Sequence, residues 1–152
     1  MFSSFRALPK GAKVLIYSAV LPFVAYGMFY IDLSFFLTSI QGLSISIMGL
    51  IVTVMGVSAF GASIPLGVAA DKYGRKRLYI VVNIMASAII AVFALTANVA
   101  ILLAAAVAEG IAEGAFAASA NALLAEKAKD ARRTDAYSVF GFVQAVAFGV
   151  AV

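Results

Sequence analysis

The sequence predicts an all-α integral membrane protein, and three observations lead to that prediction. The 152 residues are 64% hydrophobic with a mean hydropathy of +1.08. Only 12% of them are charged, whereas a typical soluble domain has about 25%. The chain therefore has too few polar residues to form a water-facing surface around an apolar core. The apolar runs are long and lack two-residue alternation, which favours helices over a transmembrane barrel.

Five apolar segments follow one another along the chain. The first four are each long enough for a helix to cross the hydrocarbon core, which takes roughly 20 residues. The fifth stops at Val152 after about 17 residues, slightly short of the ~30 Å core. We expect four complete membrane spans and a truncated fifth in one membrane domain over residues 1–152, with the spans at residues 14–36, 45–70, 78–97, 99–125 and 136–152.

The N-terminus has some features of a signal peptide, because Arg6, Lys10 and Lys13 precede the first apolar run. However, that run exceeds the 7–15 residues of a signal-peptide core, and no small-x-small cleavage site ends it. We therefore predict a retained first span, bent at Pro22 because a proline inside a helix removes a backbone donor. On the second segment, Gly49, Thr53 and Gly56 are small residues that predict close contact with another helix.

The positive charges indicate the orientation. All 11 Lys and Arg residues lie in the N-terminal tail, in residues 71–77 or in residues 126–135. Four complete spans place these three regions on one side of the membrane, and the positive-inside rule makes that side cytoplasmic. We expect a multi-pass protein of the cell membrane, plasma or inner, with a cytoplasmic N-terminus. The net charge of +4 is then explained by topology, and no nucleic-acid partner is predicted.

The most specific local pattern lies between the second and third segments. Gly67 and Gly74 permit close backbone approach or positive φ where the chain reverses, and Asp71 lies within reach of charge-assisted hydrogen bonds from Arg75 and Lys76. A simple basic turn would explain the cations alone, and this alternative stays open. It does not explain Asp71 or the glycine spacing. The phosphate-binding pattern G-x-x-x-x-G-K-[ST] is absent.

In this position the sequence resembles the signature of the major facilitator superfamily: Gly, three residues, Asp, two residues, Gly, Arg, and Lys or Arg. The match is complete at Gly67, Asp71, Gly74, Arg75 and Lys76, and the resemblance covers essentially the whole chain. It implies a twelve-helix bundle of two six-helix halves, each made of inverted three-helix repeats. The chain would be a partial N-terminal half.

The resemblance also implies a cytoplasmic gate. Asp71, Arg75 and Glu126, at the end of the fourth span, would form a charge cluster that holds the two halves together in one state and separates in the other. The C-terminal half, which would supply the partner helix, is expected to be missing from this chain. The chain is therefore not expected to transport alone.

Three acids lie within the apolar segments, at Asp32, Glu109 and Glu113, and no basic residue lies at their depth. An acid at mid-bilayer costs about 2.5–3.5 kcal/mol on insertion scales, so it should face a cavity or be protonated. Glu109 and Glu113 stack on one helix face roughly 6 Å apart and should titrate as a coupled pair. Such carboxyls suit proton coupling, although a neutral pair bonded across helices is the alternative. For Asp32 the alternative is an interfacial, water-reaching acid.

One departure from the family pattern bears on the cargo. Many drug antiporters of the family carry an Arg three residues before a Gln-Gly pair in the fourth span, where this chain has Ala106 and Glu109. With Tyr26, Phe29 and Tyr30, the acids would suit a cationic or amphipathic organic substrate through charge and cation–π contact. Packing against lipid or core is the alternative for these aromatics.

The predicted function is transport of a small organic solute by alternating access, coupled to protons, with efflux of cationic compounds as one possible direction. Zero Cys and zero His leave no common metal cluster or nucleophile–base set, so no enzyme activity and no cofactor or metal are expected. The alternative is a self-contained small membrane protein that forms an oligomer with a structural, channel, receptor or adaptor role.

Overall fold

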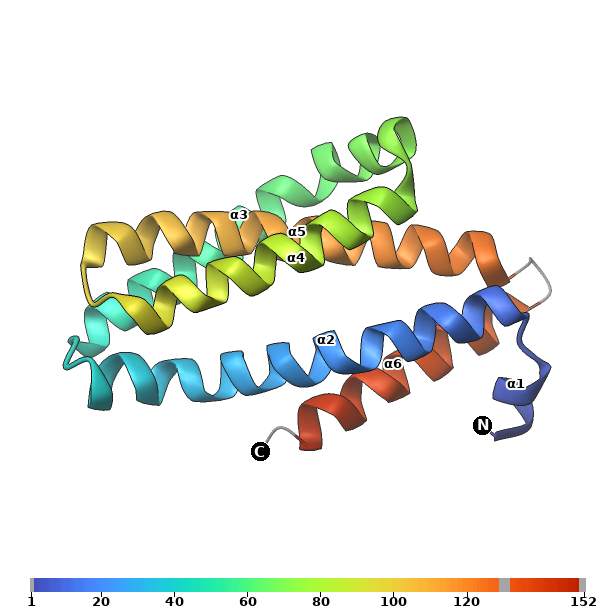
Figure 1. The fold of residues 1–152 in the computed structure, drawn as a ribbon, viewed down its shortest axis with the longest axis horizontal. Coiled ribbons are helices and arrows are strands. Elements are labelled where there is room, and N and C mark those ends of the chain that lie inside the picture. Colours follow the sequence, from blue (N-terminus) through green and yellow to red (C-terminus); the bar gives the residue numbers. More distant parts are fainter. Residues whose placement is uncertain (1, 129–131, 151–152) are drawn as a thin grey trace. The chain divides into compact units, whose positions relative to one another are not determined.

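The structure is a computed structural model that describes residues 2–128 and 132–150, and its elements are helical (Figure 1). They divide into two compact units, and the boundaries between these fall inside α2 and α5. Unit 1 comprises residues 1–32 and 121–152, and unit 2 comprises residues 33–120. In chain order the elements are α1 (Phe2–Ala7), α2 (Lys10–Phe35), a π-helical turn η1 (Phe36–Ile40), α3 (Ile45–Tyr73), α4 (Arg75–Leu95), α5 (Val99–Ala128) and α6 (Arg133–Val150).

Four helices among the described residues are long and apolar enough to cross a membrane: α2 with η1, α3, α4 and α5. The predicted fold class is thereby confirmed. The helices extend beyond the apolar runs, since α2 begins at Lys10 and α5 continues to Ala128. Lys and Arg are good helix formers, and their long side chains can carry the charge toward water from the end of a span. Charged residues therefore extend these helices.

The fifth predicted segment corresponds to α6 over its described part. Residues 151 and 152, which end that prediction, lie outside the described residues, as do residues 129–131 of the predicted basic linker. Asp135 lies in the first turn of α6, where a carboxylate is favoured by the positive end of the helix dipole.

In unit 2, α3 and α4 are joined by a single non-helical residue, Gly74, whose φ is 97°. The Gly74 N–H donates to the Ala70 carbonyl at 3.1 Å and closes the last turn of α3. A glycine with positive φ is a common way to end a helix. The expected loop over residues 71–77 was therefore wrong in extent, because helices continue to Tyr73 and resume at Arg75.

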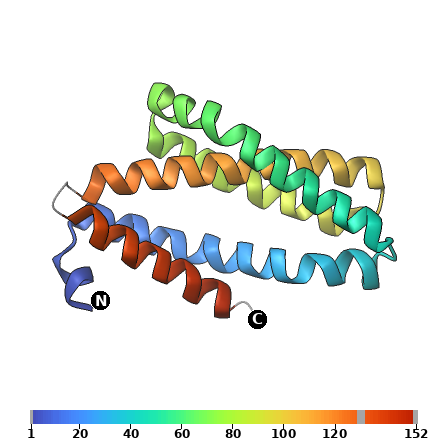
Figure 2. The ribbon, with the colours of Figure 1, turned by 180° about the vertical axis from the view of Figure 1, so that it is seen from behind.

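Two glycines on α5 bring that helix into backbone contact with α3, and Figure 2 shows the crossing. A Cβ atom at Gly110 would lie 2.2 Å from the Met55 carbonyl oxygen, and one at Gly114 would lie 2.6 Å from that of Ala59. No larger residue fits unless the helices separate, which is the packing that a small-xxx-small pattern permits.

Among the described residues, no helix makes the close contact that was predicted through Gly49, Thr53 and Gly56. A Cβ at Gly49 or at Gly56 would meet nothing within 4 Å, and Thr53 Oγ1 donates to the Gly49 carbonyl of its own helix. The close contact of α3 is made by Met55 and Ala59 instead, which lie on a different face of that helix.

In unit 1, α6 contacts α1, the middle of α2 and the C-terminal part of α5. The rings of Phe23 and Phe140 meet edge to face with centroids 5.2 Å apart. Tyr137 Oη donates to the Asn121 carbonyl at 2.9 Å, which ties the start of α6 to the end of α5.

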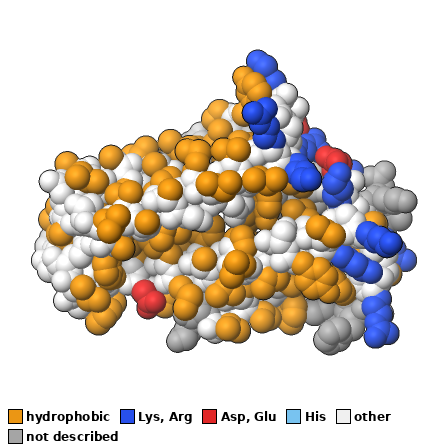
Figure 3. All heavy atoms as spheres, in the orientation of Figure 1, with side chains coloured by type: hydrophobic (Ala, Val, Ile, Leu, Met, Phe, Trp, Pro, Cys, Tyr) orange, Lys and Arg blue, Asp and Glu red, His pale blue; other side chains and the backbone are white. Residues whose placement is uncertain are grey.

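Large apolar side chains are exposed along the helices. On α3, Phe60 is 82% exposed and Ile64 is 77% exposed. Figure 3 shows hydrophobic side chains over much of the visible face. A surface of this kind is unsuited to water and matches a chain that lies in a lipid bilayer.

Candidate functional site

The five motif residues lie around the α3–α4 junction. Asp71 is in the last turn of α3, and Arg75 begins α4. The two side chains pair across the Gly74 break: Arg75 Nη2 and Nε lie 2.7 and 2.9 Å from Asp71 Oδ1. Asp71 and Lys76 are exposed and Arg75 is half-buried. The structure therefore brings together the acid and the arginine that the sequence singled out.

Gly67 and Glu126 are placed differently. Gly67 is helical within α3, and a Cβ there would meet nothing within 4 Å. Its expected close approach to another backbone is not made within the described part of the chain. Glu126 belongs to unit 1, near the end of α5, and Lys127 Nζ donates to its Oε1 at 2.6 Å. The pairing of Glu126 with Asp71 and Arg75 stays a prediction.

The three acids of the spans occupy three different environments. Glu109 is 0% exposed, and neither of its carboxyl oxygens has a hydrogen-bond partner among the described residues. Glu113, one turn along α5, is half-buried, and Asp32 on α2 is exposed. A buried polar group without a hydrogen bond is energetically unfavourable. Glu109 is therefore the anomalous member of the set.

The position of Glu109 is constrained by its neighbour in the chain. Gly110 lies against the backbone of α3, so α5 cannot rotate about its axis without losing that contact. Ala106, one turn before Gly110 on α5, is also fully buried. The pattern G-x-x-x-G at Gly110 and Gly114 is visible in the sequence and is a known signal for close helix packing, but it was not recognised there.

The three predicted aromatics form one cluster along α2 in unit 1. The Tyr26 and Tyr30 rings are stacked with centroids 6.2 Å apart, and Phe29 meets Tyr30 edge to face at 5.3 Å. Tyr26 is buried, whereas Phe29 and Tyr30 are half-buried. Spacing of one helical turn brings Tyr26 and Tyr30 together. Contact of these three rings with a substrate stays a prediction.

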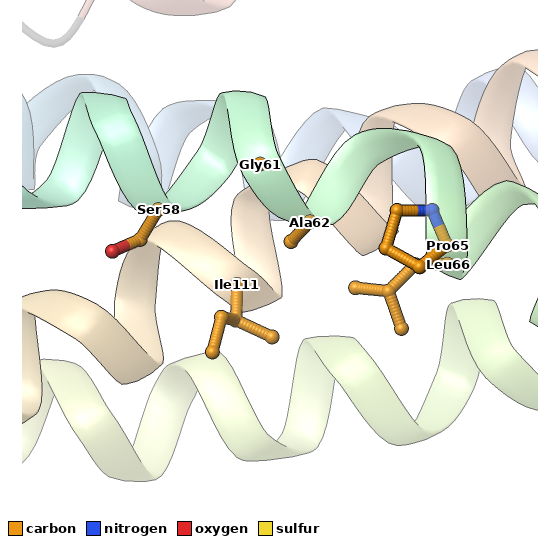
Figure 4. Close-up of a pocket in the computed structure, with 6 residues that line it drawn as sticks. All are labelled: Ser58, Gly61, Ala62, Pro65, Leu66 and Ile111. Carbon is orange, nitrogen blue, oxygen red and sulfur yellow. The ribbon is translucent and has the colours of Figure 1, made fainter.

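A groove of about 410 Å³ lies between α3 and α5 within unit 2, and sequence reasoning did not predict it (Figure 4). Its volume is within the range of small-molecule sites, but its only side-chain polar group is a hydroxyl. The candidate acids are not among its lining residues, which are Ser58, Gly61, Ala62, Pro65, Leu66 and Ile111. Small residues on α3 create the groove by leaving space beside Ile111.

Within the described part of the chain, no group of three or more His, Cys, Asp or Glu residues could hold a metal ion.

Comparison with known proteins identifies one family. The sequence model of the family described as Major Facilitator Superfamily matches residues 15–152 of the chain. Searches of curated proteins and of solved structures give no significant match.

Proposed function

The chain belongs to the major facilitator superfamily, and from that premise we propose that it serves proton-coupled transport of a cationic or amphipathic organic solute. Members of the superfamily carry solutes across membranes, and the four long apolar helices agree with that role. The proton coupling, the class of solute and the residues that act are the parts proposed.

The observation that carries the proposal is the burial of Glu109 without a hydrogen-bond partner among the described residues. An ionised carboxylate is strongly disfavoured in such a place. Glu109 would therefore hold a proton in this conformation and release it when water reaches the carboxyl. A group that changes its access to water during a cycle can couple proton movement to that cycle.

Glu113 would act beside it as the carboxyl that meets the solute. It lies on the same face of α5 and is half-buried, so a cation could approach it without complete loss of water. Tyr26, Phe29 and Tyr30 would add cation–π contacts. Asp32, which is exposed, would be the water-reaching acid of the first span.

The Asp71–Arg75 pair, with Gly67, Gly74, Lys76 and Glu126, would form the cytoplasmic gate. The proposal places the N-terminus in the cytoplasm of a cell whose plasma or inner membrane holds the protein. It includes a second six-helix half against which this part of the bundle moves.

The test of proton coupling compares two acid-to-amide variants in the complete transporter, reconstituted in liposomes. We expect Glu109→Gln to abolish solute flux driven by a pH gradient while solute exchange at equal pH continues, because exchange needs no net proton movement. The control is Asp135→Asn, an acid paired with Arg132 at 3.6 Å in the membrane-flanking part of α6. Unchanged gradient-driven flux in Glu109→Gln would overturn the proposal.

The role of Glu113 has its own measurement. Glu113→Gln should raise the KM for a cationic solute roughly tenfold, a typical size for the loss of one charge contact. The KM for an uncharged analogue should change little. Equal effects on both solutes would show that Glu113 does not contact the cation.

A further inference from the structure

We propose that Gln41 is a pin that ties η1 to the end of α4, at the end of unit 2 opposite Gly74, so that these two segments stay together when the helices of unit 2 move. The Gln41 pin is defined as the Gln41 side chain with the carbonyls of Phe93 and Thr96. Its atoms all belong to unit 2, and it is independent of the acids and of the gate.

The pin joins segments that are far apart in the chain. Gln41 Nε2 donates to the Phe93 carbonyl at 2.8 Å and to the Thr96 carbonyl at 3.0 Å. Phe93 is in the last turn of α4, and Thr96 is the residue that caps that helix. The last four carbonyls of a helix have no partner within it. The Gln41 amide thus binds one of these four carbonyls, that of Phe93, and also the carbonyl of the capping residue Thr96.

The local backbone directs Gln41 toward α4. η1 is a π-helical turn in which the Gln41 N–H donates to the Phe36 carbonyl at 3.0 Å. Gly42 follows with a φ of 72° and turns the chain toward α3. Leu37, inside η1, is fully buried and anchors the turn. A π turn of this kind often marks a functional position in a helix.

The side chain is used as a donor. Gln41 Oε1 is buried and has no hydrogen-bond partner among the described residues. A buried acceptor atom without a hydrogen bond is unfavourable. The amide at this position therefore serves as a donor in spite of that cost. If the side chain only filled space, leucine would serve equally well, because it has a similar shape and no polar atom.

The two ends of unit 2 differ in how they are held. At the Gln41 end the starts of α3 and α5 are also capped by side chains: Ser44 Oγ accepts from the Ile47 N–H at 3.3 Å, and Asn98 Oδ1 accepts from the Ala100 N–H at 3.0 Å. At the other end, α3 and α4 meet at one glycine and an exposed ion pair. The Gln41 end is therefore expected to keep its contacts when the helices of unit 2 move.

Hydrogen–deuterium exchange of the complete protein in nanodiscs tests the pin. Gln41→Leu should raise amide exchange in the last turn of α4 and in η1 about tenfold, the ratio that corresponds to about 1.4 kcal/mol of lost hydrogen bonding. The control is Gln144→Leu, which removes the same amide from an exposed position on α6 and should leave these segments unchanged. Equal exchange in Gln41→Leu and the parent would overturn the proposal, as would the same rise in the control.

A second variant, with a shorter amide side chain, covers the case in which Gln41→Leu does not fold. Gln41→Asn keeps the amide but lacks one methylene, so it cannot reach both carbonyls. If Gln41→Leu does not fold, the same local rise in exchange is expected for Gln41→Asn, and its absence would overturn the pin.

A second measurement asks whether this end stays closed during the cycle. Residues 1–152 contain no Cys, so in an otherwise cysteine-free background spin labels can be attached at Ile45→Cys and Leu95→Cys, two exposed positions at the Gln41 end. The distance between the labels should stay the same at acidic and alkaline pH, with and without solute. In Gln41→Leu its distribution should broaden. A pH- or solute-dependent distance in the parent would refute the pin.

Discussion

Glycines in this chain serve different physical purposes, although they look alike in the sequence. Gly110 and Gly114 remove the Cβ atoms that would otherwise collide with the α3 backbone, whereas Gly56 and Gly67 face open space. Gly74 supplies a positive φ at a helix end. The consequences of replacing a glycine therefore follow from its surroundings.

The first prediction concerns the α3–α5 crossing. Gly110→Ala puts a Cβ about where the Met55 carbonyl oxygen lies, so the helices must separate, and we expect a loss of about 1–3 kcal/mol in the free energy of unfolding. Gly56→Ala is the matched control in an apolar helix with free space around it. It should be neutral or stabilising by up to about 1 kcal/mol. Reversible unfolding in mixed micelles measures both, and equal values for the two variants would contradict the packing argument.

The second prediction concerns the conformation of Gly74. A φ of 97° with a ψ of 118° is unfavourable for any residue with a Cβ, so Gly74→Ala should lower the free energy of unfolding by about 1–3 kcal/mol. Gly67→Ala, in the same motif but helical and open, should not lower it. The same unfolding assay decides, and a stable Gly74→Ala protein would mean that the junction relaxes to an ordinary turn.

At the scale of elements, the α3–α4 junction combines a rigid break with a weak ion pair. Asp71 and Arg75 are 64% and 35% exposed. Ion pairs at exposed positions stabilise proteins by about 0–1 kcal/mol. The pair thus adds little to stability, which agrees with its proposed role in a gate that opens and closes.

The third prediction separates these two roles. Asp71→Asn should change the free energy of unfolding by less than about 1 kcal/mol, because water already screens the pair. If the pair belongs to the gate, the rate of solute transport should nevertheless fall strongly in the complete transporter. Arg132→Gln, which disrupts another exposed pair, that with Asp135, is the control and should leave transport unchanged. Parallel loss of stability and transport in Asp71→Asn would indicate a structural role only.

The positions of the helices could be predicted from the sequence, but their contacts could not. Long apolar runs and breaks such as Gly74 determine where helices lie, because lipid requires each span to satisfy its own backbone. The helix ends were misplaced by a few residues, since Lys72 and Arg75 continue helices in spite of their charge. The Asp71–Arg75 pair was predictable because the two residues are close in sequence.

Contacts between residues that are far apart in the sequence could not be predicted, and the reason is physical. Gln41 meets Phe93, and Gly110 meets Met55, through the crossing of helices whose relative rotation is not specified by apolar composition. Where every face of a helix is apolar, hydrophobic periodicity does not indicate which face packs. The three acids were found because ionisable groups are rare in apolar spans. Their unequal burial followed only from the fold.

At the scale of the whole molecule, the order of the spans predicts a topology. Four spans separate the N-terminal tail from the last basic region, so the tail, the α3–α4 junction and the start of α6 belong to one side of the membrane. The uncharged connections at residues 41–44 and 96–98 belong to the other. From the positive-inside rule we predict that the basic side is the cytoplasmic one.

The fourth prediction tests that topology by single-cysteine labelling. Residues 1–152 contain no Cys, so in an otherwise cysteine-free background each substitution reports alone. An impermeant thiol reagent added to intact cells should label Gly42→Cys and Asn98→Cys, and it should label Lys72→Cys and Arg133→Cys only after the membrane is opened. Labelling of all four positions from outside, or of the basic pair alone, would reverse or refute the assignment.

The one-residue junction at Gly74 also has a consequence for how α3 and α4 can be displaced along the membrane normal. A connection that short leaves no slack, so neither helix can slide along its own axis without drawing the adjoining end of the other with it. Four Lys and Arg residues lie at or directly beside this junction, and burying such charges in hydrocarbon is costly. We therefore expect the two helices to share one depth in the membrane, set by the charges at the glycine that joins them.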